Sequence, residues 1–328
     1  MPHVLVAGKL HRSGMALLES ASGVTFDYVE EVSEASYAPL IDKADGLVIR
    51  TQPLSAATVA RARKLKIVSR HGVGYDAVHL PALVERGIAL AVVGDVNSIS
   101  VAEHCMMLLL ATVKQALRAD RSVRAGNWSW RNLLQAQEVS GKCLLIIGYG
   151  RIGRNLARMA GGFGMRIRAH DPFLHEQGWP SGSVEPVTEL LEGLAWADAV
   201  SVNVPKADRP LLGAREFEAM KASAVLINTA RGGIVDESAL AAALSAGKLA
   251  GAGLDVFDSE PPRQGSPLLT MDNVLLTPHI AGLTAECAER MAVGSVQNVL
   301  DFFNGRIDAD LVVNRSQLKA PLPSLTTG

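Results

Sequence analysis

The sequence has few of the features that bind metals or cross membranes. Its 328 residues include only three cysteines, Cys105, Cys143 and Cys287, which lie far apart and form no CxxC pair. We therefore expect free thiols in a reducing compartment and no zinc site. The most lipid-like apolar run, Cys105 to Val113, is far shorter than the about 20 residues that span a bilayer. No leader peptide precedes the first strand-like run, so we expect a cytoplasmic protein without a membrane partner.

An excess of charge of one sign is also absent. The formal net charge is −1, because 33 acidic residues nearly balance 32 basic ones. Such a balance gives no field that would attract the protein to nucleic acid or to an anionic membrane. Hydrophobic residues make up 48% of the chain, which is enough to fill the cores of about two domains at this length. We therefore expect no nucleic acid and no membrane as partner.

Short β-branched or apolar runs alternate with helix-compatible stretches along the whole chain. This alternation is typical of βαβ units, in which helices cover parallel sheets. It predicts the α/β class with two doubly wound parallel-sheet domains. The expected strands are Val4 to Ala7, Val24 to Val29, Gly46 to Arg50, Ile67 to Arg70, Ile88 to Val93, Leu144 to Ile147, Arg166 to His170, Ala199 to Val204, Ala224 to Asn228, Gly251 to Val256 and Val274 to Leu276.

The second set of strands opens on a glycine fingerprint. Gly148, Gly150 and Gly153 follow the apolar run that begins at Cys143 and lead into a helix-compatible stretch. Gly148 lets the chain turn sharply, Gly150 lets a pyrophosphate approach the backbone, and Gly153 lets the helix pack close to the sheet. The helix N-terminus favours an anion, and Arg151 adds a full positive charge beside it. The pattern predicts a dinucleotide site.

Asp171 indicates which dinucleotide binds. It ends the next expected strand, about 20 residues beyond the glycines, where its carboxylate can accept hydrogen bonds from the adenosine ribose hydroxyls. A 2′-phosphate would be repelled there, and the residues that follow, Pro172 and Phe173, carry no positive charge. The sequence therefore predicts NAD rather than NADP as the cofactor.

Three further expectations concern helices and the tail. The helix that enters the dinucleotide domain is expected to start near Ser100, with Ser98 or Ser100 as its N-cap. The last helical stretch, Thr284 to Phe303, follows the completed second sheet, so we expect it to cross back to the first domain. The tail from Ala320 to Gly328 is rich in Pro, Ser and Thr and is expected to be disordered.

Motifs spread over nearly the whole chain carry a family resemblance. They are His71-Gly-Val-Gly74, the glycine fingerprint, Ile227-Asn-Thr-Ala-Arg-Gly-Gly233, Gly253-Leu-Asp-Val-Phe257, Glu260-Pro-Pro262 and Pro278-His-Ile-Ala-Gly282. In this order they resemble the D-isomer-specific 2-hydroxyacid dehydrogenases, which include phosphoglycerate, glyoxylate/hydroxypyruvate and D-lactate dehydrogenases. The resemblance implies a central Rossmann NAD domain, residues 100–283, and a discontinuous flavodoxin-like substrate domain, residues 1–99 and 284–328. It also implies a homodimer formed through the NAD domain, and the short form of the family without a regulatory domain.

The chemistry of that family needs a cation and a proton donor. Hydride addition to a 2-oxo acid builds negative charge on the carbonyl oxygen, which is then protonated. Arg231 follows an expected strand, and its planar guanidinium can bind carboxylate and carbonyl together. His279 also follows a strand, and imidazole titrates in the range that reversible proton transfer requires. Glu260 can fix the tautomer of the ring and stabilise its charged form.

Each of these three residues has a plainer interpretation when taken alone. Arg231 can be a surface ion-pair partner, His279 a hydrogen-bonded core histidine, and Glu260 a solvated acid in a turn. The resemblance favours the catalytic interpretation, because the three match the catalytic Arg, Glu and His of the family motif by motif.

The resemblance also assigns binding residues. The expected cofactor contacts are Gly148, Gly150, Arg151, Ile152, Gly153, Asp171, Pro172, Val204, Pro205, Thr229, Ala230, Asp255 and Gly282. Asp255 is implied as the contact to the nicotinamide carboxamide, with a structural role as the alternative. The expected substrate contacts are Arg50, the backbone N–H groups of Gly72, Val73 and Gly74, Arg231 and His279. A simple tight turn is the alternative for the Gly72 to Gly74 segment.

Other candidate residues have less defined roles. Trp128, Trp130 and Arg131 lie where family members vary, and they either reach the cleft of a partner subunit or pack a dimer. The histidines His71, His104, His170 and His175 have no metal-ligand spacing, so we interpret them as structural and expect no metal site.

The charge count favours a short 2-oxo acid with a polar or anionic tail. If Arg231 and the Gly72 to Gly74 amides hold the reacting carboxylate, Arg50 remains for the tail, with Arg131 a weaker candidate. A bulky apolar tail would leave a buried cation unpaired. Glyoxylate, hydroxypyruvate and a phosphorylated or sulfonated three-carbon acid fit, each reduced to a D-2-hydroxy acid. The alternative is a catalytically idle NAD-sensing protein on the same fold, because fold does not fix function.

Overall fold

The structure is a computed structural model that describes residues 1–182, 184–318 and 322. The chain divides into two compact units. Unit 1 comprises Met1–Asn97 and Leu283–Gly328, and unit 2 comprises Ser98–Gly282. Most of the tail that is expected to be disordered lies outside the described residues.

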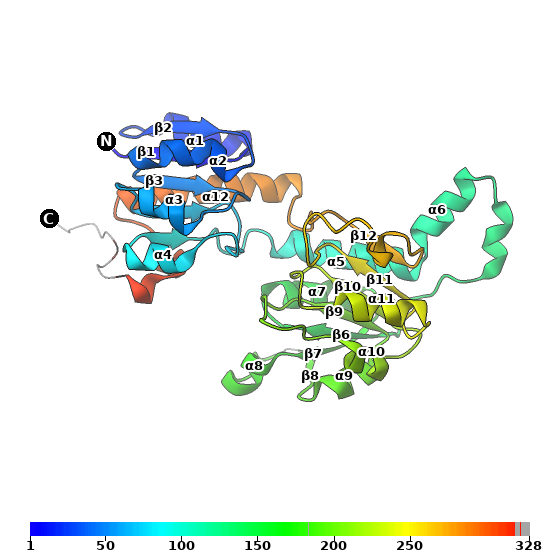
Figure 1. The fold of residues 1–328 in the computed structure, drawn as a ribbon. Helices are drawn as coiled ribbons and strands as arrows, with labels where there is room; N and C mark the ends of the chain where they lie inside the picture. Colours follow the sequence, from blue (N-terminus) through cyan, green and yellow to red (C-terminus); the bar gives the residue numbers. More distant parts are fainter. Residues whose placement is uncertain (183, 319–321, 323–328) are drawn as a thin grey trace. The chain divides into compact units, whose positions relative to one another are not determined.

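Unit 1 contains a five-stranded sheet in which all neighbouring strands are parallel (Figure 1). Its strands are β1 (His3–Ala7), β2 (Thr25–Val29), β3 (Gly46–Ile49), β4 (Ile67–Arg70) and β5 (Ala89–Ala91). Their order, β2-β1-β3-β4-β5, is that of flavodoxin-like doubly wound sheets. The central strands are continuous apolar runs because helices bury both of their faces.

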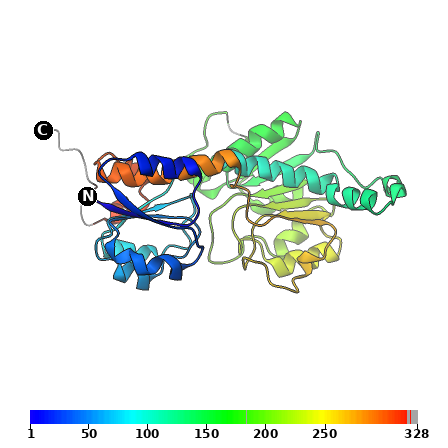
Figure 2. The ribbon, with the colours of Figure 1, turned by 90° about the horizontal axis from the view of Figure 1, so that it is seen from above.

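Helices cover both faces of the unit 1 sheet (Figure 2). On one face α1 (Arg12–Ser20) packs against α12 (Ala285–Phe303), the long helix from the C-terminal part of the chain. This approach is close, since a Cβ added to Gly14 would lie 2.8 Å from the Cβ of Ala292. On the other face lie α2 (Glu34–Tyr37), η1 (Ala38–Lys43), α3 (Ala56–Arg61) and α4 (Leu80–Glu85). Short turns η4 (Ala309–Leu311) and η5 (Arg315–Gln317) follow α12.

Unit 2 contains a seven-stranded sheet whose neighbouring strands are again all parallel. Its strands are β6 (Cys143–Ile147), β7 (Arg166–His170), β8 (Glu185–Pro186), β9 (Ala199–Val202), β10 (Val225–Asn228), β11 (Gly251–Leu254) and β12 (Val274–Leu276). The order β12-β11-β10-β9-β6-β7-β8 reverses between β6 and β9, which is the topological switch point of a Rossmann sheet. The predicted α/β class with two doubly wound parallel sheets is confirmed.

The helices of unit 2 also form two layers. The first contains α5 (Ser98–Val113) and α7 (Arg151–Gly162), and the second contains α9 (Leu190–Trp196), α10 (Ala214–Ala219) and α11 (Glu237–Ser245). Outside these layers lie α8 (Pro172–Gln177) and η3 (Pro267–Leu269). The expected N-cap of α5 is wrong: Ser98 and Ser100 both lie inside the helix. Ser98 is buried and its Oγ accepts a hydrogen bond from Asn155 Nδ2 of α7, so tertiary packing sets this helix start.

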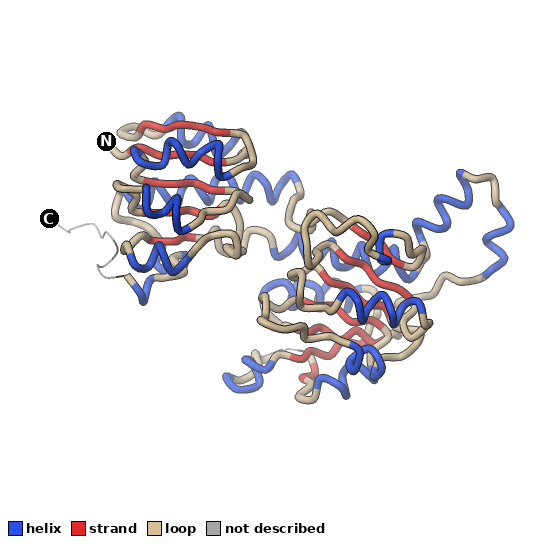
Figure 3. The backbone as a smooth tube through the Cα atoms, viewed as in Figure 1, coloured by secondary structure: helices blue, strands red, loops and turns tan. Residues whose placement is uncertain are grey.

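One segment of unit 2 projects from the sheet and its helices (Figure 3). It consists of α6 (Ala116–Arg124) and η2 (Trp128–Leu133), and none of the residues of either helix is buried. We call residues 116–138 the arm. Large apolar side chains are exposed along it, with Trp128 at 67% and Leu134 at 87%.

Among the described residues, no helix is both long and apolar enough to cross a membrane. The three cysteines are buried and free, as the sequence predicts. Burial raises the pKa of Cys105 to about 11, so this thiol stays protonated at neutral pH.

Candidate active site

The parallel strands of unit 2 bring six loops to one edge of the sheet, where their carboxyl ends meet. The glycine fingerprint follows β6, and Asp171 follows β7. Val204 and Pro205 follow β9, and Thr229 and Ala230 follow β10. The loops after β11 and β12 carry Asp255, Glu260 and His279, and Gly282 is the last residue of the unit.

The glycine loop has the shape that the sequence predicts. Gly148 adopts a left-handed φ of 90°, and a Cβ there would collide with the Asn203 carbonyl oxygen. A Cβ on Gly153 would collide with the carbonyl oxygen of Gly148, so the helix packs directly on the loop. Gly150 is the N-cap of α7 and has open space where its Cβ would be. The Gly150 N-cap offers no side chain to the first N–H groups of the helix, and Arg151 follows it. This cradle fits a pyrophosphate.

Asp171 lies beside that loop. Its Oδ2 accepts a hydrogen bond from Tyr149 N at 2.8 Å, and its Oδ1 accepts one from Leu174 N at 3.2 Å as the N-cap of α8. Pro172 is the first residue of α8. Two backbone contacts therefore hold the Asp171 carboxylate at the edge of the glycine loop, and each oxygen keeps a lone pair for a further donor.

Thr229 and Ala230 are both buried after β10. The Thr229 Oγ1 lies 3.0 Å from the Cys105 Sγ, and Ala230 N donates to Asn228 Oδ1 at 3.0 Å. Any cofactor contact at these two positions is therefore made mainly by the backbone. Val204 packs near Gly148, where the loops after β6 and β9 approach each other at the switch point.

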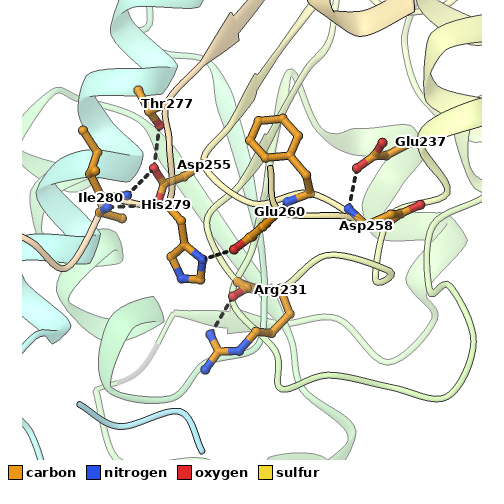
Figure 4. A network of polar contacts seen from close by, with 11 residues as sticks. Arg231, Glu237, Asp255, Asp258, Glu260, Thr277, His279 and Ile280 are labelled. Atoms are coloured by element: carbon orange, nitrogen blue, oxygen red, sulfur yellow. Dashed lines mark hydrogen bonds and ion pairs between the residues drawn. The ribbon is translucent and has the colours of Figure 1, made fainter. Parts of the chain in front are cut away.

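Arg231, Glu260 and His279 extend from three neighbouring loops (Figure 4). Arg231 is half-buried, and its Nη1 donates to the Ala230 carbonyl oxygen at 2.7 Å. The His279 Nδ1 lies 2.7 Å from Glu260 Oε2, with side-chain exposures of 49% and 38%. The second oxygen of Glu260 accepts a hydrogen bond from Phe257 N at 3.2 Å. The carboxylate thus fixes the imidazole through Nδ1 and leaves Nε2 at the other edge of the ring.

His279 is held in an unusual backbone conformation. Its φ is 53°, which a residue with a side chain adopts at a cost. The Asp255 carbonyl oxygen accepts a hydrogen bond from His279 N at 2.8 Å. The Asp255 carboxylate accepts three more bonds, from Thr277 Oγ1, Ile280 N and Ala281 N. Asp255 therefore organises the whole His279 loop.

The Asp255 side chain is 0% exposed. Burial alone would raise its pKa, but hydrogen bonds from His104, Thr277 and the two backbone amides outweigh burial and lower it. The His104 Nε2 lies 2.9 Å from Thr277 Oγ1 and 3.5 Å from Asp255 Oδ1, which is the structural role expected of that histidine. These contacts give Asp255 a structural role, and its contact to the nicotinamide carboxamide stays a prediction.

In unit 1, the expected substrate residues follow two adjacent strands. Arg50 follows β3, and its Nη1 donates to the Lys9 carbonyl oxygen at 3.3 Å. Gly72, after β4, has a φ of 146°, and its N–H donates to the Arg70 carbonyl oxygen at 2.9 Å. The Gly72 amide is therefore already engaged, so an anion-binding turn here would rely on the amides of Val73 and Gly74.

Sequence reasoning did not select Arg70, which ends β4 beside the end of β3. Its Nη1 donates to the His71 carbonyl oxygen at 2.7 Å. Burial lowers the pKa of His71 to about 4, and the positive charges of Arg50 and Arg70 act in the same direction. Both guanidinium groups thus act on one buried histidine. The sequence signal that could have identified Arg70 is that each of two successive expected strands ends in an arginine.

Within the described part of the chain, no group of three or more His, Cys, Asp or Glu side chains can hold a metal ion.

Comparison with known proteins agrees with this site. A family model, D-isomer specific 2-hydroxyacid dehydrogenase, NAD binding domain, matches residues 106–281. The chain is 35% identical over 317 residues to the D-3-phosphoglycerate dehydrogenase of Methanocaldococcus jannaschii, covering 96% of this chain and 60% of that protein. It is 35% identical over 333 residues to the glyoxylate reductase of Korarchaeum cryptofilum, covering 98% of each. The chain belongs to the D-isomer-specific 2-hydroxyacid dehydrogenase family.

A solved structure of this 2-hydroxyacid dehydrogenase fold gives the same result. The NADPH-dependent glyoxylate/hydroxypyruvate reductase from Sinorhizobium meliloti is 29% identical, with a TM-score of 0.82, over 94% of this chain and 97% of that one. The predicted family is confirmed, and its NAD(P) site lies in unit 2. The chain spans 60% and 57% of the length of two archaeal phosphoglycerate dehydrogenases.

Proposed function

We propose that this chain is an NAD-dependent dehydrogenase that interconverts a short 2-oxo acid and its D-2-hydroxy acid, with Arg231, Glu260 and His279 as catalytic residues. The observation that carries the proposal is the 2.7 Å contact between His279 Nδ1 and Glu260 Oε2. The Glu260 carboxylate accepts a hydrogen bond from Nδ1–H and so keeps that proton in place. The proton that is exchanged with the substrate is then the one on Nε2.

The chemistry divides between the cofactor and the side chains. When bound, the nicotinamide supplies or accepts the hydride. Arg231 binds the carboxylate and the carbonyl oxygen of the acid through its planar fork, which stabilises negative charge on that oxygen. His279 donates its Nε2 proton to the same oxygen in reduction and removes it in oxidation. Glu260 stabilises the charged imidazole, which is the form that donates the proton in reduction and the form that results when the proton is removed in oxidation.

The substrate tail is proposed to be anionic or polar. Arg50 follows β3 and Arg70 ends the adjacent strand β4, and the positive charges of both act on His71, so this part of unit 1 favours a negative group. We propose that Arg50, with the amides of Val73 and Gly74, contacts the substrate, and that Arg70 adds to its charge selectivity. Glyoxylate, hydroxypyruvate, its phosphate and sulfopyruvate fit this proposal. An apolar tail would remove water from the cations without offering them a hydrogen bond or a negative charge.

A substrate panel tests the function and the tail together. We expect NADH oxidation to be fastest with one of the polar or anionic acids, and chiral analysis to show the D-type product. The comparison is kcat/KM for glyoxylate, hydroxypyruvate, its phosphate, sulfopyruvate, pyruvate and branched or aromatic 2-oxo acids. Preference for a branched or aromatic acid would remove the tail proposal but keep the catalytic one. No turnover on any acid would favour the idle NAD-sensing alternative.

The cofactor preference is proposed to be NAD over NADP, and Asp171 carries it. We expect Asp171→Ala to raise KM for NADH markedly and to narrow the advantage of NADH over NADPH, because the carboxylate contacts the ribose hydroxyls and repels a 2′-phosphate. Steady-state kinetics with both cofactors measures the change. The matched control is Glu176→Ala, which removes an exposed carboxylate from the end of α8. An unchanged ratio in Asp171→Ala would contradict the assignment.

We further propose a cytoplasmic homodimer formed through unit 2. The arm exposes Trp128, Leu133 and Leu134 without a core of its own, and a second copy is the partner that would cover them. The Arg131 guanidinium carbon lies 5.8 Å from the centroid of the Trp128 ring, so the two side chains form a cation–π pair on the arm.

A further inference from the structure

Two loops of the proposed catalytic site are joined by contacts outside the catalytic residues. The first loop follows β10 and carries Arg231; the second follows β11 and carries Glu260. Asp258, two residues before Glu260, accepts a hydrogen bond at its Oδ1 from Gly233 N at 2.7 Å. Gly233 has a left-handed φ of 83° and lies two residues after Arg231. The carboxylate of Asp258 therefore bridges the two loops.

The bridge is reinforced on both sides. A Cβ on Gly232 would collide with the Phe257 carbonyl oxygen, so the loops touch along their backbones. The backbone N–H of Asp258 donates to Glu237 Oε1 at 2.6 Å, which ties the second loop to the first turn of α11 (Figure 4). Burial raises the pKa of Glu237, and the hydrogen bond from the Asp258 amide opposes this increase. Glu237 is thus the anchor of the second loop, through its acceptor oxygen Oε1.

We propose that Asp258 is a positioning residue, anchored by Glu237, that sets the Arg231 guanidinium relative to the Glu260–His279 pair. The inference rests on the proposed function. Arg231 must hold the carbonyl oxygen where His279 can protonate it, and those two groups come from different loops. Asp258 touches neither reacting group, but it fixes the backbone of one loop against the other. Small displacements matter at such a site, because a misplacement of about 1 Å can cost about 10²-fold in rate.

The test compares two substitutions at one position. Asp258→Ala removes the acceptor, and we expect it to lower kcat/KM for the preferred 2-oxo acid about 10-fold, by a lower kcat and a higher KM for the acid. KM for NADH should not change, since the glycine loop and Asp171 are untouched. Asp258→Asn keeps the Oδ1 acceptor and should stay within about 3-fold of the wild type. Glu218→Ala, which removes an exposed carboxylate paired with Lys248 at 2.9 Å, is the matched control.

Two further readouts separate positioning from general stability. The alkaline fall of kcat/KM should move to lower pH in Asp258→Ala, because a displaced Glu260 stabilises the protonated imidazole less well. Hydrogen exchange of the peptide around Gly233 should become faster in Asp258→Ala and stay slow in Asp258→Asn, without substrate present. The thermal midpoint should change little in either variant.

Failure of the Asp258 proposal can be distinguished from failure of the proposed function. Wild-type enzyme that turns over no 2-oxo acid contradicts the function, while the exchange result still tests the bridge. Wild-type kinetics and pH profile in an active Asp258→Ala would overturn the positioning role. So would equal losses in Asp258→Ala and Asp258→Asn, or a loss of NADH affinity and thermal stability that accounts for the lower rate. If Asp258→Ala does not fold, Glu237→Ala against Glu237→Gln gives the same comparison at the anchor.

Discussion

Replacing His279 with alanine is expected to lower kcat by about 10²- to 10⁴-fold, because the carbonyl oxygen loses its proton donor. NADH binding should stay close to that of the wild type. The glycine loop and Asp171 lie after β6 and β7, whereas His279 lies after β12 at the other end of the sheet order. Single-turnover absorbance of NADH gives the rate, and titration of NADH fluorescence gives the affinity.

The matched control is His175→Ala, which removes an exposed imidazole from α8 and should leave kcat unchanged. Combined loss of rate and NADH affinity in His279→Ala would instead indicate a structural histidine. That result is a real alternative, because the His279 loop is held in its left-handed conformation by the buried Asp255. The two measurements must therefore be made on the same preparation.

Local rules predict most of the fold because both sheets are parallel and buried on two faces. Such strands are short apolar runs between helices, and all eleven expected strands overlap observed ones. The strand that was missed, β8 (Glu185–Pro186), has two residues, both exposed, at the sheet edge. It carries no apolar signal, and proline at an edge is a weak strand former.

Sequence reasoning is least reliable where a polar side chain has several possible partners. Ser98 and Ser100 looked like N-caps, but Ser98 instead accepts a bond from Asn155 on α7. Asp255 stands in a motif that implies a ligand contact, and the structure adds a second role, because its carboxylate accepts three hydrogen bonds from the loop that follows β12. A one-dimensional motif shows which residue is required, but not whether it acts on the ligand or on its neighbours.

Asp258 and Glu237 gave no signal for a related reason. Asp258 reads as a solvated turn residue, and Glu237 as an ordinary acid in the first turn of a helix. Their shared role exists only because β10 and β11 are adjacent, so that the loops at their carboxyl ends meet. The arginines at the ends of β3 and β4 have the same origin, since strand pairing places Arg70 beside Ile49, next to Arg50. Such pairs are visible once the strand order is known.

Replacing Arg231 with lysine keeps the positive charge, and yet turnover is expected to fall steeply. The proposed contact uses two parallel N–H groups on a planar guanidinium, one for the carboxylate and one for the carbonyl oxygen. An ammonium group is a point charge and cannot reproduce that geometry. The loop also holds the guanidinium in place, because Arg231 Nη1 donates to the Ala230 carbonyl oxygen at 2.7 Å.

The expected loss is about 10²-fold or more in kcat/KM for the 2-oxo acid, which corresponds to about 3 kcal/mol of transition-state stabilisation. Steady-state kinetics on the preferred acid measures it, with KM for NADH as the internal check. Arg263→Lys, at an exposed position beyond the Glu260 loop, is the matched control and should behave as the wild type. Near-normal activity in Arg231→Lys would return Arg231 to the role of a surface ion-pair partner. The carbonyl oxygen would then have to be bound by another group of the site.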